Sequence, residues 1–140
     1  MVDQQKPLNF ASNPEIGYEV TRREDGGMHL TFSDLNASTI KHWQNFSEEH
    51  LLGSDRLTRN LYDLRNVKNI TEEAIHVAVQ LNSDPSTRNI RLAVVVANDA
   101  LRDAVQKVAD RTSGGGTRMA IFTDLKEAEI WLSRPMESMV

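Results

Sequence analysis

A nearly continuous run of apolar, mostly β-branched residues occupies positions 90–97, Ile-Arg-Leu-Ala-Val-Val-Val-Ala. The run is far shorter than the ~20 apolar residues needed to span a bilayer, and its valines favour a strand over a helix. Strands that are apolar on both faces lie inside parallel sheets covered by helices. The run therefore predicts the central strand of an α/β domain.

An antiparallel hairpin is expected near the start of the chain. Apolar residues alternate along 18–20 and again along 28–32, which is the period-two pattern of a strand with one buried face. The residues between them, Glu-Asp-Gly-Gly at 24–27, supply the positive φ angles of a tight turn. The first two strands are therefore predicted to pair directly.

Helices and strands alternate along the rest of the sequence. Apolar residues recur at helical spacing in four stretches, and short strands are predicted at 61–64 and 118–122. The expected helices begin at capping residues, which are Asp34, Thr71, Asn98 or Asp99, and Asp124. In the same order, they are expected to end at Gly53, at Asn82 to Pro85, at the glycines 114–116 and at Pro135. Asp124 with Glu127 has the form of a capping box.

The predicted order is β-β-α-β-α-β-α-β-α. Because crossovers between parallel strands are right-handed and carry helices, strands two to five should be mutually parallel and the first antiparallel. We therefore predict an α/β fold with a mixed, mostly parallel sheet of about five strands covered by about four helices. It forms one domain over residues 16–134, between a flexible arm at 1–15 and a tail at 135–140.

Composition excludes several classes of function. The net charge is −4, whereas nucleic-acid binders normally carry a basic face. The chain has no cysteine, which excludes disulfides and thiolate metal sites. Residues 1–14 are polar and lack the apolar region of a signal peptide. We expect a cytoplasmic protein with no membrane span and no nucleic-acid partner.

No catalytic motif is present in the sequence. The glycines at 114–116 lie between a helix and a strand, whereas phosphate loops run from a strand into a helix. The histidines, His29, His42, His50 and His76, show no metal-ligand spacing, and His29 is expected on the polar side of its strand. We therefore expect no enzymatic activity, no metal and no cofactor.

Polar residues follow the predicted parallel strands, at the edge where open α/β sheets bind ligands. The candidate binding residues at this carboxyl-end rim are Asp63, Arg65, Asn66, Thr71, Glu72, Glu73, Asn98, Asp99 and Asp124. Helix capping alone explains the residues that lie at predicted helix starts. Their convergence on one edge still makes the rim the predicted binding surface.

The whole layout resembles the STAS domain over about residues 16–134. The resemblance rests on the element order, on Leu-Tyr-Asp-Leu at 61–64, on the valine-rich strand, and on Asp-Leu-x-x-Ala-x-x-Trp-Leu at 124–132. It is strongest with the SpoIIAA-like branch, which includes uncharacterised bacterial proteins and is related to anti-sigma-factor antagonists and to the CRAL-TRIO lipid-binding fold. The resemblance implies a regulatory module that binds a protein partner or self-associates.

The same resemblance implies that a serine phospho-switch is missing. Thr71-Glu72-Glu73-Ala74 falls where antagonists of the family carry Asp-Ser-(Ser/Thr)-Gly, so glutamates replace both hydroxyl positions. Glutamates in a first helical turn also stabilise a helix by themselves.

One alternative function is a carrier of a small apolar molecule or lipid. It predicts an enclosed apolar pocket between helix and sheet. Its candidate lining residues are Met28, Leu30, Phe32, Trp43, Phe46 and Trp131. The commoner use of such residues is to fill a core. An enzyme, the third class, would instead show titratable groups clustered in a cleft.

Overall fold

Five strands form one sheet, and they lie side by side in the order in which they occur along the chain. The computed structural model describes residues 10–50, 58–84, 90–112 and 118–134. The strands are β1 (Tyr18–Arg22), β2 (Met28–Phe32), β3 (Thr58–Asp63), β4 (Ile90–Val95) and β5 (Arg118–Phe122). β1 pairs antiparallel with β2, and the other neighbouring pairs are parallel. The predicted mixed, mostly parallel sheet is confirmed.

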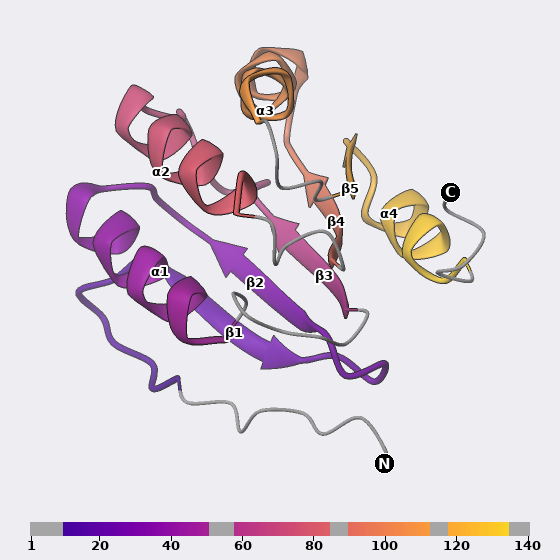
Figure 1. Cartoon of the computed structure of the whole chain (residues 1–140), viewed down its shortest axis with the longest axis horizontal. Helices are drawn as coiled ribbons and strands as arrows, with labels where there is room; N and C mark the ends of the chain where they lie inside the picture. Colours follow the sequence, from indigo (N-terminus) through magenta and orange to yellow (C-terminus); the bar gives the residue numbers. More distant parts are fainter. Residues whose placement is uncertain (1–9, 51–57, 85–89, 113–117, 135–140) are drawn as a thin grey trace.

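Four helices cover the sheet unequally (Figure 1). They are α1 (Ala37–His50), α2 (Glu72–Asn82), α3 (Asp99–Arg111) and α4 (Leu125–Leu132). The first three bury their apolar residues against one face of the sheet, where the main core lies. On the opposite face α4 packs against Leu61, Ala93 and Val95 and lies mainly over β3, β4 and β5. In the described part of the chain, this face of β1 and β2 has no helix above it.

The prediction that β4 is an interior strand covered on both faces is confirmed, although the middle strand of the five is β3. All six of its residues are buried, because β3 and β5 flank it and helices lie on both faces. The strand ends at Val95, and Ala97, the last residue of the apolar run, is exposed. The burial of Arg91 was not expected from the sequence, because arginine is seldom fully buried and this one is 0% exposed.

The predicted hairpin is also confirmed. Arg23 and Gly27 close the turn with a backbone hydrogen bond of 2.8 Å, and Gly26 has a φ of 90°. Gly27 serves a second purpose, because a Cβ there would overlap the carbonyl oxygen of Arg59 on β3. The turn can therefore approach the next strand closely.

Some predicted boundaries differ from the structure. β3 begins at Thr58, three residues before the predicted start, and ends at Asp63. Asp34 is not the N-cap of α1: the helix begins at Ala37, and the Asp34 carboxylate instead accepts hydrogen bonds from the Asn36 backbone and the Thr39 hydroxyl. The expected stops at Gly53, at Pro85, at the glycines 114–116 and at Pro135 lie outside the described residues.

Part of the predicted N-terminal arm packs on the domain. The ring of Phe10 lies 5.1 Å from that of Tyr18 and 5.8 Å from those of His42 and Phe46. These contacts place Phe10 over the space between β1 and α1. Residues 1–9 of the arm and the tail at 135–140 lie outside the described residues.

Candidate functional site

The rim predicted from the sequence begins at Asp63, the last residue of β3. Its carboxylate is buried and accepts hydrogen bonds from the Arg65 backbone, Nε and Nη2 at 3.0, 2.9 and 2.7 Å. Burial alone would raise the pKa of Asp63, but these hydrogen bonds outweigh it and hold the pKa below its ordinary value. The exposed guanidinium of Arg65 is thereby held at the carboxyl end of the sheet, where Asp124 also acts on it electrostatically.

Three of the candidate residues cap helices, as predicted. Thr71 accepts a hydrogen bond from the Ala74 backbone at 3.1 Å and starts α2. Asn98 accepts one from Leu101 at 3.0 Å, and Asp124 accepts one from Lys126 at 2.8 Å. Each side chain satisfies an N–H group that the helix itself leaves open.

The remaining rim residues, Asn66, Glu72, Glu73 and Asp99, are exposed. Glu72 lies 3.4 Å from Arg111, and Asp99 lies 4.0 Å from Arg102. Such surface pairs contribute about 0–1 kcal/mol. They leave the carboxylates accessible to a partner.

A polar hollow lies where the loop after β2 meets the loop after β3. Asp34, Asn36, Lys68, Asn69, Thr71 and Glu73 are among the residues that line it. We call it the rim hollow. The predicted rim residues therefore form two groups. Thr71 and Glu73 line the rim hollow, and Asp63, Arg65 and Asp124 lie together in the other group. Neither group includes Asn98 or Asp99.

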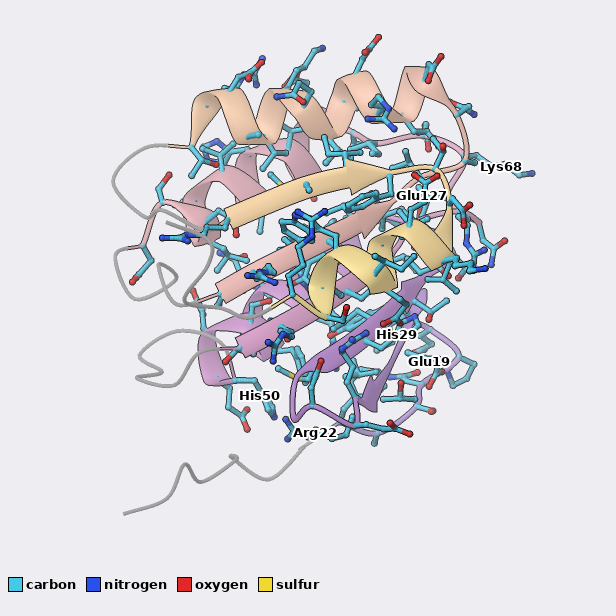
Figure 2. The ribbon with its side chains drawn as sticks, turned by 90° about the vertical axis from the view of Figure 1, so that its right-hand side faces the viewer. Glu19, Arg22, His29, His50, Lys68 and Glu127 are labelled. Atoms are coloured by element: carbon cyan, nitrogen blue, oxygen red, sulfur yellow. The ribbon has the colours of Figure 1, made fainter. Side chains whose placement is uncertain are left out.

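His29 belongs to a second polar region, which the sequence analysis missed. It lies on the face of β2 opposite the main core, beside α4 and close to β1 (Figure 2). The ring is half-buried, and its Nε2 atom is buried without a hydrogen-bond partner among the described residues. The sequence predicts His29 on the polar side of its strand, and the structure places it there.

Two ion pairs flank His29. Arg23 forms paired hydrogen bonds of 3.0 and 2.9 Å with the Glu129 carboxylate on α4 and also contacts Asp25. The second pair is Asp63 with Arg65. Burial lowers the pKa of His29. The carboxylates of the two pairs raise this pKa, and their guanidinium groups lower it. The ring is therefore held neutral near pH 7, and its buried Nε2 atom has no hydrogen-bond partner in the part of the chain that the structure describes.

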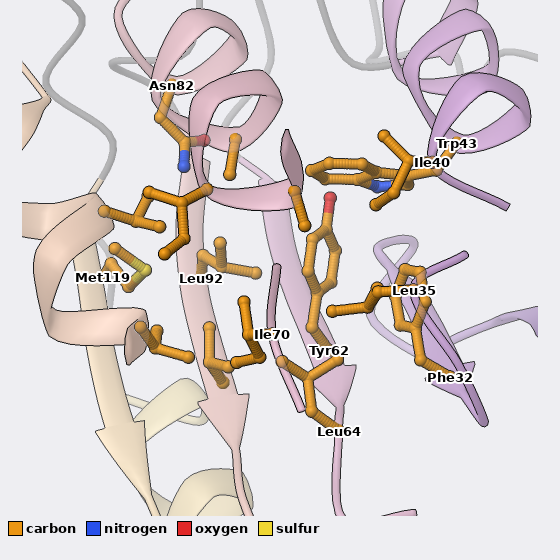
Figure 3. Close-up of a pocket in the computed structure, with 16 residues that line it drawn as sticks. Phe32, Leu35, Ile40, Trp43, Tyr62, Leu64, Ile70, Asn82, Leu92 and Met119 are labelled. Atoms are coloured by element: carbon orange, nitrogen blue, oxygen red, sulfur yellow. The ribbon is translucent and has the colours of Figure 1, made fainter. Parts of the chain in front are cut away.

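An apolar cavity of about 70 Å³ lies under the three helices of the main core. Figure 3 shows Tyr62 pointing from β3 toward Trp43, with Leu92 on β4 and Met119 on β5. Burial raises the pKa of Tyr62 to about 12. Of the lining residues predicted for a carrier, Phe32 and Trp43 line this cavity, whereas Met28, Leu30, Phe46 and Trp131 do not.

Two further properties limit what the described residues can do. No three histidine, aspartate or glutamate side chains among them converge to hold a metal ion. None of the helices they form is both long and apolar enough to cross a bilayer.

Comparison with known proteins identifies the fold. Neither a protein-family model nor a curated protein matches the sequence. Among solved structures, the chain is similar to an uncharacterised protein of the DUF3478 family from Shewanella loihica PV-4, described as having a SpoIIAA-like fold. The TM-score is 0.58 at 18% sequence identity, and the match covers 89% of this chain and 99% of that chain. The SpoIIAA-like fold expected from the sequence is therefore shown.

Proposed function

We propose that this chain is a non-catalytic regulatory module that binds a protein partner through the rim around the start of α2. The observation that supports this most is the rim hollow, which joins two loops at the carboxyl end of the sheet and places Glu73 beside Lys68 and Thr71. Loops held by a rigid sheet are where binding residues concentrate. The SpoIIAA-like fold makes a regulatory role the natural interpretation of such a surface.

Glu72 and Glu73 give this surface its charge. Both are exposed in the first turn of α2, where carboxylates are stabilised by the helix dipole. By the STAS resemblance they stand where antagonists carry the serine that is phosphorylated. The proposed module therefore presents a permanent negative charge in place of a switchable one.

A pair of charge reversals tests the surface. Glu73→Lys changes the rim, whereas Glu48→Lys changes another exposed glutamate, in the last turn of α1. The measurement is quantitative affinity enrichment of proteins from the native host, on variants whose melting temperatures match. We expect wild type and Glu48→Lys to retain the same proteins, and Glu73→Lys to lose them. If Glu73→Lys and Glu48→Lys retain the same proteins, the rim is not the interface.

Phosphopeptide mapping tests the missing switch. Protein purified from its own host should carry no phosphate on Thr71, whose hydroxyl oxygen caps α2. Stoichiometric phosphate on Thr71 would instead assign the chain to the phosphorylation-controlled antagonists.

The second candidate function is transport of a small apolar molecule, which the cavity under the helices favours. Its size argues against a lipid. Ligand pockets typically measure about 300–1,000 Å³, whereas this cavity measures about 70 Å³. A carrier function would require α1, α2 and α3 to move away from the sheet.

A further inference from the structure

Three arginines occupy matching positions on three neighbouring strands. Arg59 on β3 pairs in register with Arg91 on β4, and Arg91 pairs with Arg118 on β5. Neighbouring strands lie about 4.8 Å apart and paired side chains point to the same face. The three side chains therefore leave the sheet side by side on the face that carries α4, near the amino ends of their strands.

The end of α4 lies over this row. Arg91 Nη1 donates to the carbonyl oxygens of Trp131, Leu132 and Arg134 at 3.1, 3.4 and 2.7 Å. Arg59 Nη2 donates to the same Arg134 oxygen at 3.0 Å. Helix carboxyl ends attract cations, which explains how Arg91 can be fully buried in β4.

These carbonyl groups do not balance the charge. A helix end carries roughly half of one negative charge, whereas the guanidinium groups of Arg59, Arg118 and Arg134 gather here around Arg91. Among the described residues, Arg23, Arg65, Arg102 and Arg111 each pair with a carboxylate. Arg59, Arg118 and Arg134 form no such pair within that part of the chain.

Two further observations indicate that an anion could bind to this arginine cluster. Burial lowers the pKa of Arg91, and the charges of Arg59, Arg118 and Arg134 lower it further, so these three guanidinium groups lie close enough to act on Arg91. The Nε atom of Arg59 is buried and has no hydrogen-bond partner among the described residues. Arg118 and Arg134 are exposed, so a ligand can reach the cluster from solvent.

We propose that Arg59, Arg118 and Arg134, arranged around the buried Arg91, bind a phosphate group, either as inorganic phosphate or as a small phosphate monoester. The planar, forked guanidinium donates paired hydrogen bonds to phosphate oxygens. A phosphate carries close to two negative charges at neutral pH, which suits several cations better than a single carboxylate does. The site needs no glycine-rich loop, and it does not depend on the rim, because it lies at the opposite ends of the strands.

Calorimetric titration of the full chain with inorganic phosphate tests the proposal, at an ionic strength held constant with chloride. Arg118→Ala removes an exposed guanidinium, and Arg134→Ala removes another while it keeps the carbonyl oxygen that Arg59 and Arg91 use. We expect saturable binding that each variant weakens about tenfold, the loss expected for one charge-assisted hydrogen-bonded contact. Lys107→Ala, which removes an exposed charge from α3, should change the affinity less than twofold.

A second titration with glycerol 3-phosphate distinguishes the two sources of phosphate. Tighter binding of the monoester would assign an esterified ligand, and tighter binding of inorganic phosphate would assign the free ion. The proposal is overturned if neither compound binds saturably, or if Lys107→Ala weakens binding as much as Arg118→Ala and Arg134→Ala do. Because Arg118 and Arg134 are both exposed, at least one variant should keep the melting temperature of the wild type.

Discussion

The hydroxyl of Thr71 shows how a single side chain starts a helix in this fold. Its Oγ1 atom accepts the Ala74 N–H at 3.1 Å. Thr71→Ala leaves that group without its side-chain partner and should lower the free energy of unfolding by about 0.5–2 kcal/mol. Urea unfolding measures the loss. Thr71→Ser keeps the acceptor and should stay close to wild type, so equal losses for both variants would contradict the capping role.

His29 should make stability depend on pH. Its pKa is lowered in the folded state, so the unfolded chain takes up the proton first as the pH falls. The stability that the neutral ring contributes is complete above the unfolded pKa of about 6.5 and is lost as the pH falls through the folded pKa. Asp63 stays ionised in this range because its own pKa is lowered.

The measurement is the melting temperature between about pH 5 and 8. His29→Gln should show a weaker decrease on acidification than wild type does. His76→Gln, which changes an exposed histidine on α2, is the control and should follow the wild-type curve. If the His29→Gln and wild-type curves run parallel, the proton on His29 does not couple to folding.

The roles of single residues were predicted correctly where they depend on residues close in sequence. Thr71, Asn98 and Asp124 cap the helices that follow them, and capping involves only residues two or three positions away. His29 differs, because its surroundings come from Arg23, Glu129 and Asp63. No local pattern could show that α4 would bring Glu129 to the edge of β2.

Among the strands and helices, β4 shows that the burial of a strand and the burial of its one charged residue have different causes. The apolar pattern of 90–97 predicted burial on both faces, and β4 shows it. The burial of Arg91 depends on carbonyl oxygens about 40 positions later in the chain. Strand propensity therefore located the element, while the end of α4 determined what Arg91 does in it.

A buried charge in β4 tests this element. Val95 is 0% exposed and pairs in register with Asp63, so Val95→Asp would bury a second carboxylate beside the first. We expect a loss of about 3 kcal/mol or more in the free energy of unfolding. Thr21→Asp, at an exposed position of β1, should cost about 0.5 kcal/mol or less. Melting of Val95→Asp within a few degrees of wild type would contradict the assignment of β4 as an interior strand covered on both faces.

For the molecule as a whole, the strand directions were predicted from the sequence, whereas the order of the strands in the sheet and the face that α4 covers were not. Right-handed crossovers and a single hairpin leave few topologies for this order of elements. Because β2 to β5 lie side by side in chain order, right-handed crossovers put α1, α2 and α3 on the same face, whereas α4 follows the last strand and covers the other face. Three helices gather on one face, and the short α4 leaves polar side chains of β1 and β2 accessible on the other (Figure 2).

Whether the molecule is a carrier or a module depends on what occupies the cavity under the helices. An engineered cavity of about 150 Å³ can bind benzene, and this one has about half that volume. A protein module should leave it empty, so native mass spectrometry after mild purification should show the mass of the chain alone. A carrier should retain an adduct.

Filling the cavity distinguishes the two functions by stability. Ala78 lines the cavity from α2, and Ala78→Leu adds apolar atoms there at little cost in helix propensity. If the cavity is empty, the variant should gain about 1 kcal/mol in the free energy of unfolding. Ala104→Leu is the matched control, because Ala104 is half-buried on α3 and does not line the cavity. It should therefore gain less. An adduct that is present in wild type and in Ala104→Leu but missing in Ala78→Leu would show that the cavity holds a ligand, and the carrier function would then replace the module.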